Sequence, residues 1–299
     1  MPANPDERFA VKLQSKYQLV KQKQEPHLFH EISIMGQMDH PFILKLNGVS
    51  QDKRLVYMFT EYMVCGDLMA TVNKFKQLSA HHARFYAAQV VDSLEYMHGR
   101  DFIYRDLKPE NVLLCPNGYI KLADFGFVKK LPKYERCMTF CGTPEYMAPE
   151  IIQNKSYGHA VDWYAVGIFL YELLVRRLAQ PFMASDPYKI FERVLNEKLR
   201  FPAGFDKAAK SLIKHLCAHD LSKRYGNLHG GVDDIKRHRF FADFDWQKLR
   251  DMRMPVYYTP VAKAKADGDE VEAGDLEESR DNTKFPPIKE SKDPFLAWF

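Results

Sequence analysis

The residues best suited to chemistry lie in one polar segment, Tyr104-Arg105-Asp106-Leu107-Lys108-Pro109-Glu110-Asn111, and in the triplet Asp124-Phe125-Gly126, which begins thirteen residues after Asn111. Transfer of a phosphoryl group needs a carboxylate that orients the attacking hydroxyl and hard oxygen ligands for Mg²⁺. Asp106 suits the first task, and Asn111 together with Asp124 suits the second. Lys108 is placed to offset charge on the transferring group. A charged surface loop is the plain alternative, but a match at eight positions plus the downstream triplet argues against it.

A second charge pair is predicted upstream. Residues 8–14 alternate between apolar positions and a face that carries Ala10 and Lys12, which predicts a strand. A lone lysine on a strand is usually just solvated. The helix predicted over residues 25–38 carries Glu31, which could pair with Lys12 and aim its amine at the phosphates of ATP. ATP and Mg²⁺ are therefore the expected cofactors.

The elements that must hold these groups follow from hydrophobic periodicity. Strands are predicted near residues 43–50 and 54–60, and with the first strand they make a small mixed lobe that ends near Met63. From Ser79, which is a suitable N-cap, apolar residues recur at steps of three or four and predict a long helix.

The next segment must bring the two halves of the polar site together. Asn117-Gly118 has the signature of a hairpin turn, which would fold the chain back so that Asn111 and Asp124 meet. A loop over residues 128–148 then leads into apolar-rich helical patterns from 162 to about 241.

Bulk composition excludes several classes of protein. The 299 residues are 46% apolar and 27% charged, as in an ordinary soluble globular protein. A formal charge of +4 without a dense basic stripe argues against nucleic acid as a partner. The longest strongly apolar stretch, residues 164–171, is far short of the roughly 20 residues that a membrane span needs.

The five cysteines and the amino-terminal residues indicate the compartment. The cysteines are odd in number and lack the C-x-x-C spacing of metal sites, which favours reduced thiols in a cytoplasmic or nuclear protein. The first residues show neither a signal-peptide pattern nor the glycine after Met1 that myristoylation requires.

Three further motifs are similar to those of a known family: Ala83-Arg84-Phe85-Tyr86-Ala87-Ala88-Gln89, Cys141-Gly142-Thr143-Pro144-Glu145-Tyr146 and Arg224-Tyr225-Gly226-Asn227-Leu228. Met147-Ala148-Pro149-Glu150 also falls where protein kinases place Ala-Pro-Glu, downstream of Asp-Phe-Gly. From about residue 8 to residue 260 the chain resembles AGC-group serine/threonine protein kinases. It is most similar to the catalytic subunits of cyclic-AMP-dependent kinases, and its last residues resemble a protist version of their aromatic tail.

The resemblance implies a fold and a function. The fold is α+β and bilobal, with a truncated β-sheet in a partial N-lobe over residues 8–63, a mainly helical C-lobe over 64–245 and a C-terminal tail over 246–299. The implied activity is transfer of the ATP γ-phosphate to Ser or Thr in Arg-directed, basic protein substrates. A cyclic-AMP-binding regulatory subunit is the implied partner.

The resemblance also assigns catalytic and nucleotide-binding residues. Asp106 and Lys108 would be catalytic, and Asn111 and Asp124 would bind both the nucleotide and the metal. Thr60 would be the small gatekeeper residue at the back of the adenine pocket. The remaining residues that would bind ATP, by packing on adenine, presenting backbone groups to it or gripping the phosphates, are Ala10, Lys12, Glu31, Glu61 and Met63.

The loop over residues 128–148, named here the activation loop, carries the implied regulatory site. Thr139 would be phosphorylated, and its phosphate would be held by Arg105, Lys129 and His27. A bare threonine in a loop usually has no such role, but the basic residue beside Asp106 favours it here. At the end of the loop the family places a buried ion pair, which corresponds to Glu150 and Arg224.

A last set of residues would recognise the substrate. The family reads arginines that precede the phosphorylated residue with acidic side chains, and it receives the following residue in an apolar pocket. The acidic positions are Asp67, Glu110, Glu145 and Glu172, and the apolar positions are Phe140, Pro144 and Met147.

The chain also departs from the family. The seven residues before Arg8 contain no G-x-G-x-x-G turn, and the two strands that flank it are not found. We therefore expect these 299 residues alone to bind ATP weakly and to catalyse poorly, and an upstream extension of roughly 30–40 residues to restore activity. Met138 replaces a Trp that packs against the regulatory subunit. Phe285 could match an adenine-contacting Phe, but the residues after it differ from the pattern of the family.

The carboxyl-terminal residues form two segments of different composition. Residues 267–282 hold eight acidic residues and a single Arg, which predicts a solvated segment. The bulky apolar residues that follow should either dock on the protein surface or reduce solubility; they are Phe295, Leu296, Trp298 and Phe299.

Two alternative functions are kept. A pseudokinase would use the fold as a binding module without phosphate transfer; the missing glycine turn favours it, whereas the complete set of catalytic residues opposes it. A cyclic-GMP-dependent kinase has a similar catalytic domain, but it carries nucleotide-binding domains in the same chain, and these 299 residues hold none.

Overall fold

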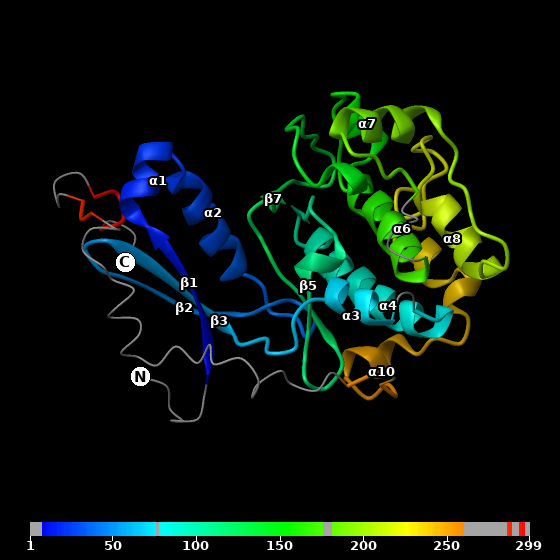
Figure 1. Ribbon diagram of the computed structural model, residues 1–299, viewed down its shortest axis with the longest axis horizontal. Coiled ribbons are helices and arrows are strands. Elements are labelled where there is room, and N and C mark those ends of the chain that lie inside the picture. The colour runs from blue at the N-terminus through cyan, green and yellow to red at the C-terminus, as the bar shows by residue number, and fades with distance from the viewer. Residues whose placement is uncertain are drawn as a thin grey trace. The chain divides into compact units, whose positions relative to one another are not determined.

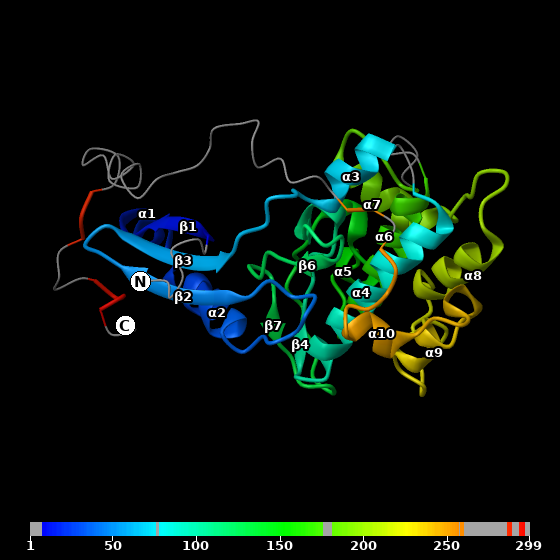
Figure 2. The same ribbon diagram turned by 90° about the horizontal axis from the view of Figure 1, so that it is seen from below.

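The computed structural model describes residues 8–75, 78–175, 181–256, 258–259, 286–288 and 293–296. The described chain divides into two compact units. The first contains residues 8–39 and 44–65 with the two short carboxyl-terminal segments, and the second contains residues 40–43 and the described residues from 66 to 259. Figures 1 and 2 show a sheet with two helices in the first unit and a mostly helical second unit.

A three-stranded antiparallel sheet with the strand order β1-β3-β2 forms the base of the first unit. The strands β1 (Phe9–Ser15), β2 (Leu46–Gln51) and β3 (Leu55–Glu61) confirm the three predicted strands. The central strand β3 begins with four buried residues, Leu55 to Met58. Apolar, β-branched and aromatic side chains of this kind suit a strand with neighbours on both sides.

Two helices accompany the sheet, α1 (Lys16–Gln22) and α2 (Glu25–Met35). The prediction of one helix over residues 25–38 is correct for α2 but missed α1. Ser15 begins α1 because its hydroxyl accepts a hydrogen bond from the backbone N–H of Gln18 at 3.3 Å. Lys23 ends α1 in the left-handed conformation, with φ of 55°.

Of the carboxyl-terminal residues predicted to dock, Phe295 packs on this unit. The ring of Phe295 is fully buried and its centroid lies 5.2 Å from that of Phe29. Next to it, Asp293 accepts a hydrogen bond from Lys16 Nζ at 2.7 Å. Leu296 is exposed. The remaining tail predictions, for residues 267–282, Phe285, Trp298 and Phe299, lie outside the described residues.

The second unit is organised around the helix α6 (Ala160–Leu174), in which every residue except Leu174 is buried. A mostly apolar helix that is buried on all sides lies in the centre of a domain. It packs against α4 (Ala80–His98) and α8 (Lys207–Leu216). Ser79 caps α4 by accepting a hydrogen bond from the N–H of His82 at 3.3 Å, as predicted.

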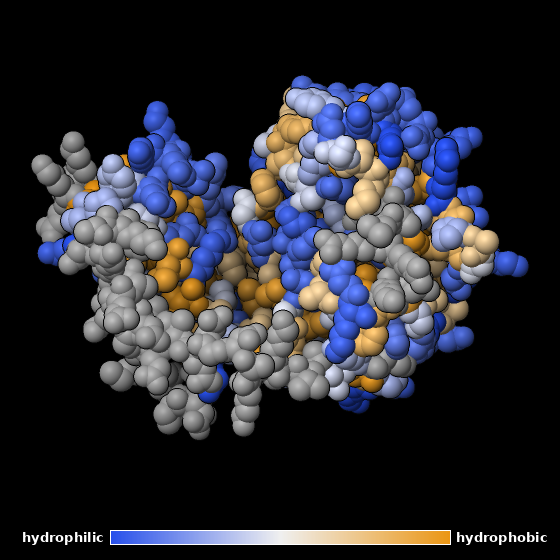
Figure 3. Space-filling model, viewed as in Figure 1, coloured by the Kyte–Doolittle hydropathy of each residue, from blue (hydrophilic) through white to orange (hydrophobic). Residues whose placement is uncertain are grey.

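Together with α6 and α8, the helices between residues 181 and 241 confirm the helical pattern predicted from residue 162 to about 241. Shorter helices complete the second unit. They are α3 (Leu68–Phe75), α5 (Pro149–Ile152), α7 (Pro187–Asn196), α9 (Asp233–Lys236) and α10 (Trp246–Arg250), with 3₁₀ turns η1 (Pro109–Asn111), η2 (Pro144–Tyr146) and η4 (Arg239–Phe241). Figure 3 shows a face of this unit on which hydrophilic and hydrophobic residues are mixed. In the described part of the chain, no helix combines the length and the apolar character needed to cross a membrane.

Two small pairs of antiparallel strands position the residues of the polar site. The strand β5 (Val112–Leu114) pairs with β6 (Ile120–Leu122), and β4 (Phe102–Ile103) pairs with β7 (Lys129–Lys130). The predicted turn at Asn117-Gly118 joins β5 to β6, and Gly118 has φ of 82°. A Cβ atom at Gly118 would also lie 2.2 Å from a methyl group of Val256, so this position requires glycine.

Candidate active site

The carboxylate of Asp106 lies at the centre of a hydrogen-bonded cluster in the second unit and is 3% exposed. Its Oδ1 accepts hydrogen bonds from the backbone N–H and the hydroxyl of Thr143, at 3.1 and 2.6 Å. Its Oδ2 accepts one from Asn111 Nδ2 at 2.9 Å and lies 2.9 Å from Lys108 Nζ. Lys108 also donates to the Thr143 hydroxyl at 2.9 Å. The structure thus brings together three residues that the sequence predicted, and adds Thr143.

Asn111 and Asp124 approach each other because the β5–β6 hairpin returns the chain, as predicted. The backbone N–H of Ala123 donates to the carbonyl of Asn111 at 2.8 Å. The amide nitrogen of Asn111 donates to both the backbone and the side chain of Asp106, which leaves the amide oxygen as a ligand. Asp124 is exposed and adopts a left-handed backbone with φ of 56°. Two oxygen donors suit Mg²⁺, which completes its shell with water and phosphate oxygens.

Asp162 on α6 fixes the backbone just before Asp106 by hydrogen bonds. The two carboxylate oxygens of Asp162 accept hydrogen bonds from the N–H groups of Arg105 and Tyr104, at 2.8 and 2.9 Å. His98 Nε2 lies 2.7 Å from the same carboxylate. Burial alone would raise the pKa of Asp162, but these hydrogen bonds hold the pKa below its ordinary value. Arg105 has φ of 71°, a conformation that costs of order 1–3 kcal/mol and that Asp162 stabilises.

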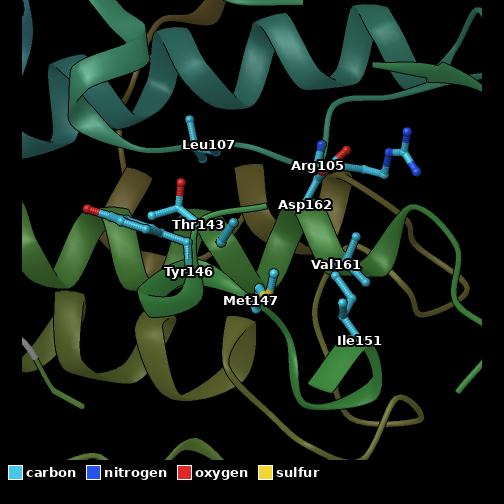
Figure 4. Close-up of a pocket in the computed structure, with 9 residues that line it drawn as sticks. Arg105, Leu107, Thr143, Tyr146, Met147, Ile151, Val161 and Asp162 are labelled. Atoms are coloured by element: carbon cyan, nitrogen blue, oxygen red, sulfur yellow. The ribbon is translucent and has the colours of Figure 1, made fainter. Parts of the chain in front are cut away.

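The loop that carries Asp106 and the end of the activation loop are in close contact. Figure 4 shows Asp162 beside Arg105 and Thr143 near Leu107, around a small pocket of about 10 Å³. This volume holds at most a single water molecule. Gly142 has φ of 109°, and a Cβ there would lie 2.7 Å from the carbonyl oxygen of Arg105, so only glycine permits the approach.

Arg105 and Lys129, predicted to hold a phosphate on Thr139, both point at Cys137. Arg105 Nη1 lies 3.5 Å and Lys129 Nζ 3.7 Å from Cys137 Sγ. The hydroxyl of Thr139 lies 3.4 Å from the same sulfur. Tyr157 fixes the loop at this point, because its hydroxyl donates to the carbonyl of Thr139 at 2.6 Å. The third predicted residue, His27, lies on α2 in the first unit.

Glu150 and Arg224 form the buried ion pair that the sequence predicted. Arg224 Nη1 and Nη2 donate to the two carboxylate oxygens of Glu150 at 2.5 and 3.0 Å. Arg224 also donates to the backbone carbonyls of Ala160 and Ala218. The pair therefore connects α5 to the beginning of α6 and to the segment after α8.

The four acidic residues predicted to read substrate arginines have different surroundings. Glu110 is exposed on η1, and Glu145 is half-buried on η2. Glu172 is buried and accepts a hydrogen bond from the hydroxyl of Tyr146. Asp67 accepts one from the N–H of Ala70 at 2.7 Å, so that its carboxylate also begins α3.

The three apolar residues predicted for the substrate pocket also differ. Phe140 is 52% exposed, and its ring packs edge to face on Phe191 of α7, with 5.8 Å between the centroids. Pro144 begins η2. Met147 is buried and lines the small pocket of Figure 4.

In the first unit, Lys12 and Glu31 form the predicted ion pair. Lys12 Nζ lies 2.7 and 3.0 Å from the two carboxylate oxygens of Glu31. Glu31 is buried, whereas the side chain of Lys12 is 52% exposed and therefore keeps a face open to a ligand. Because successive side chains of a strand alternate, Ala10 shares a face of β1 with Lys12.

The residues predicted to contact adenine lie in the same sheet or directly after it. Ala10 lies directly opposite Thr60 in the register of β1 with β3. Glu61 ends β3, and its carboxylate accepts a hydrogen bond from the N–H of Lys45 at 3.0 Å. Met63 follows two residues after β3.

Three residues of the second unit that shape the site were missed. Thr143 lies within the quoted Cys141-to-Tyr146 motif, so its position was visible although its contact with Asp106 was not. Asp162 gave a weaker signal, as an acidic residue at the start of a mostly apolar helix. Cys137 gave none, because no short pattern links it to Lys129, eight residues before it, or to Arg105, 32 residues before it.

The fold and this geometry agree with comparisons against known proteins. The family model for the protein kinase domain matches residues 2–241. The chain belongs to the protein kinase family.

Three relatives of the chain are named as protein kinases that depend on cyclic nucleotides. The chain is 40% identical over 291 residues to the cAMP-dependent protein kinase catalytic subunit of Dictyostelium discoideum, which covers 97% of this chain and 44% of that protein. It is 41% identical to the human cAMP-dependent protein kinase catalytic subunit PRKX, over 87% of this chain and 71% of that protein. It is also 42% identical to the cGMP-dependent protein kinase egl-4 of Caenorhabditis elegans, over 87% of this chain and 33% of that protein. The chain thus spans less than half of the length of the first and the third of these relatives.

Proposed function

We propose that the protein is a serine/threonine kinase that transfers the γ-phosphate of ATP to Ser or Thr in Arg-containing protein segments. The observation that carries this proposal is the carboxylate of Asp106, which is buried and held by Thr143, Asn111 and Lys108. A carboxylate fixed in this way can accept a hydrogen bond from a substrate hydroxyl and orient it for attack on a phosphoryl group.

The other groups have separate tasks. Lys108 offsets negative charge that develops on the transferring group, and Thr143 keeps Lys108 next to Asp106. Asn111 and Asp124 supply the oxygen ligands for Mg²⁺, which neutralises phosphate charge when it is bound. In the first unit, Lys12 binds the phosphates of ATP, and Glu31 orients its amine.

Substrate selection and regulation follow from the same family relationship. Glu110, Glu145 and Glu172 recognise arginines before the phosphorylated residue, and Phe140 receives the apolar residue after it. A phosphate on Thr139 would pair with Arg105 and Lys129 and stabilise the activation loop. A cyclic-nucleotide-binding regulatory subunit is the partner we propose, because relatives with about 40% identity are named as cAMP-dependent catalytic subunits.

The test is phosphate transfer from γ-labelled ATP, with Mg²⁺, to a peptide with arginines two and three positions before a single Ser. Matched peptides carry Glu in place of both arginines, or Pro directly after the Ser. We expect labelling of the Arg peptide to exceed that of the other two. A preference for the acidic or the Pro peptide would refute the substrate class, and ATP binding without transfer to any peptide would favour a pseudokinase.

A further inference from the structure

Cys137 is the single buried residue between positions 133 and 140, where all the others are exposed. Two cations from separate elements converge on its sulfur, Arg105 at 3.5 Å from the loop before Asp106 and Lys129 at 3.7 Å from β7. The backbone of Cys137 is fixed as well, because its N–H and C=O groups form a two-way bridge to Tyr157, with both distances 2.8 Å. The sulfur is thus held in a positively charged site.

The surroundings determine which group carries negative charge here. Burial alone would raise the pKa of the Cys137 thiol, but hydrogen bonds with Thr139 and Tyr157 and the charge of Arg105 lower it to about 7. The two other titratable neighbours behave differently, because burial raises the pKa of both Tyr157 and Cys141. At neutral pH a large fraction of Cys137 is therefore thiolate, the form of cysteine that reacts with oxidants.

We propose that Cys137 is a modification site at which hydrogen peroxide oxidises the sulfur to a sulfenate held between Arg105 and Lys129. The thiolate attacks one oxygen of the peroxide, so that an S–O bond forms and the O–O bond breaks. The hydroxide that leaves takes the proton of the new S–OH group and becomes water. Sulfur loses two electrons and peroxide gains them. The product remains an anion, so it keeps both cationic partners.

The burial of Cys137 restricts which oxidants can reach it. Its exposed fraction is 3%, which admits a molecule close to water in size more readily than a bulky disulfide reagent. Cys217 offers a matched internal control because it is also buried, at 6%, but burial raises the pKa of its thiol to about 12. Comparison of the two thiols therefore separates the effect of charge from the effect of access.

One consequence of the proposal rests on the proposed function. Arg105 and Lys129 are also the cations proposed to hold a phosphate on Thr139. A phosphate there would compete for them, raise the pKa of Cys137 and slow its oxidation. Oxidation of the chain without the phosphate does not depend on kinase activity.

The test uses the full chain after phosphatase treatment, exposed to dilute hydrogen peroxide at pH 7. The oxidation is quenched with catalase, and the samples are then unfolded in the presence of iodoacetamide, which alkylates the remaining free thiols. Peptide mass spectrometry measures the fraction of each cysteine protected from alkylation. We expect Cys137 to be oxidised at least about tenfold faster than Cys217. Equal rates for the two cysteines would overturn the proposal.

A pair of variants tests the charge mechanism. Lys129→Met removes one cation and should slow the oxidation of Cys137 and move its pH profile upward, whereas Lys129→Arg should keep the wild-type rate. An unchanged rate and pH profile in Lys129→Met would contradict a site built on these charges.

The last comparison uses the chain phosphorylated on Thr139. Slower oxidation there supports the link to phosphorylation, and an unchanged rate refutes that link while leaving the oxidation result to stand on the Cys217 comparison.

Discussion

Arg224 and Glu150 form a bidentate ion pair in which both side chains are buried, with N–O distances of 2.5 and 3.0 Å. Removal of one partner of such a pair leaves an uncompensated charge in the interior. We therefore expect Arg224→Ala to lower the free energy of unfolding by about 3–5 kcal/mol, measured by urea denaturation.

The control for this prediction is Arg237→Ala. Arg237 pairs with Asp233 at 3.0 Å, but its side chain is 82% exposed, and exposed pairs contribute about 1 kcal/mol or less. Equal losses in the two variants would show that the Glu150–Arg224 pair does not stabilise the second unit.

Phe295 should stabilise the first unit by packing on Phe29. Phe295→Ala removes a fully buried ring and should cost about 3–5 kcal/mol. The measurement is hydrogen exchange of α2, which should become faster. Leu296→Ala is the matched control at the next position, because Leu296 is 53% exposed and its loss should leave the exchange rate unchanged. The same effect of both substitutions would mean that Phe295 does not hold the tail in place.

The network around Asp92 on α4 predicts a pH dependence of stability. Burial alone would raise the pKa of Asp92, but hydrogen bonds from His40 and Arg250 lower it from 3.8 to about 2. Because the folded-state pKa is depressed, the stabilisation is complete above about pH 4 and is lost as the pH falls through about 2. Its size is about 2 kcal/mol.

The measurement for Asp92 is thermal unfolding of the wild type and of Asp92→Asn between pH 2 and pH 6. The difference in stability between the wild type and the variant should shrink as the pH falls across the acid range, because the variant cannot titrate at this position. A difference between the two that stays constant with pH would contradict the depressed pKa.

Activity should depend on a phosphate at Thr139. Without it, Arg105 and Lys129 have only the Cys137 sulfur and neighbouring polar groups as partners, and the activation loop lacks its strongest anion. Thr139→Ala should reduce turnover on an Arg peptide at least about tenfold, with the phosphorylation state of the wild type checked by mass spectrometry. Phosphatase treatment should lower wild-type turnover to the level of the variant and leave the variant unchanged. Undiminished activity in Thr139→Ala would mean that the loop is held without a phosphate.

Local patterns explain why most of the site could be predicted from the sequence. Asp106, Lys108 and Asn111 lie within one short segment, and the hairpin turn at Asn117-Gly118 implies that Asp124 returns to them. The cap at Ser79 and the alternation around Lys12 are equally local signals. In each of these cases the residues that determine the geometry are neighbours in the chain.

The missed residues depend on contacts that short patterns do not encode. Asp162 lies 57 residues from Arg105, and the contact between Cys137 and Arg105 spans 32 residues. The helix α1 was missed because seven residues hold too few apolar repeats for a periodic signal. Asp67 differs from these residues because its contact is local. It was predicted to recognise the substrate, and the structure shows that its carboxylate also accepts a hydrogen bond from the backbone at the start of α3.

The most direct test of the central claim is single-turnover phosphate transfer by the wild type and by Asp106→Asn. The protein is in excess over γ-labelled ATP, so that slow transfer to an Arg peptide is still detected, and nucleotide binding is measured in parallel. If Asp106 orients the substrate hydroxyl, the variant should transfer phosphate about 10²–10⁴ times more slowly while its affinity for ATP stays nearly unchanged. Transfer by Asp106→Asn at more than about a tenth of the wild-type rate would contradict this role for Asp106, and no transfer by the wild type would contradict the proposed kinase activity.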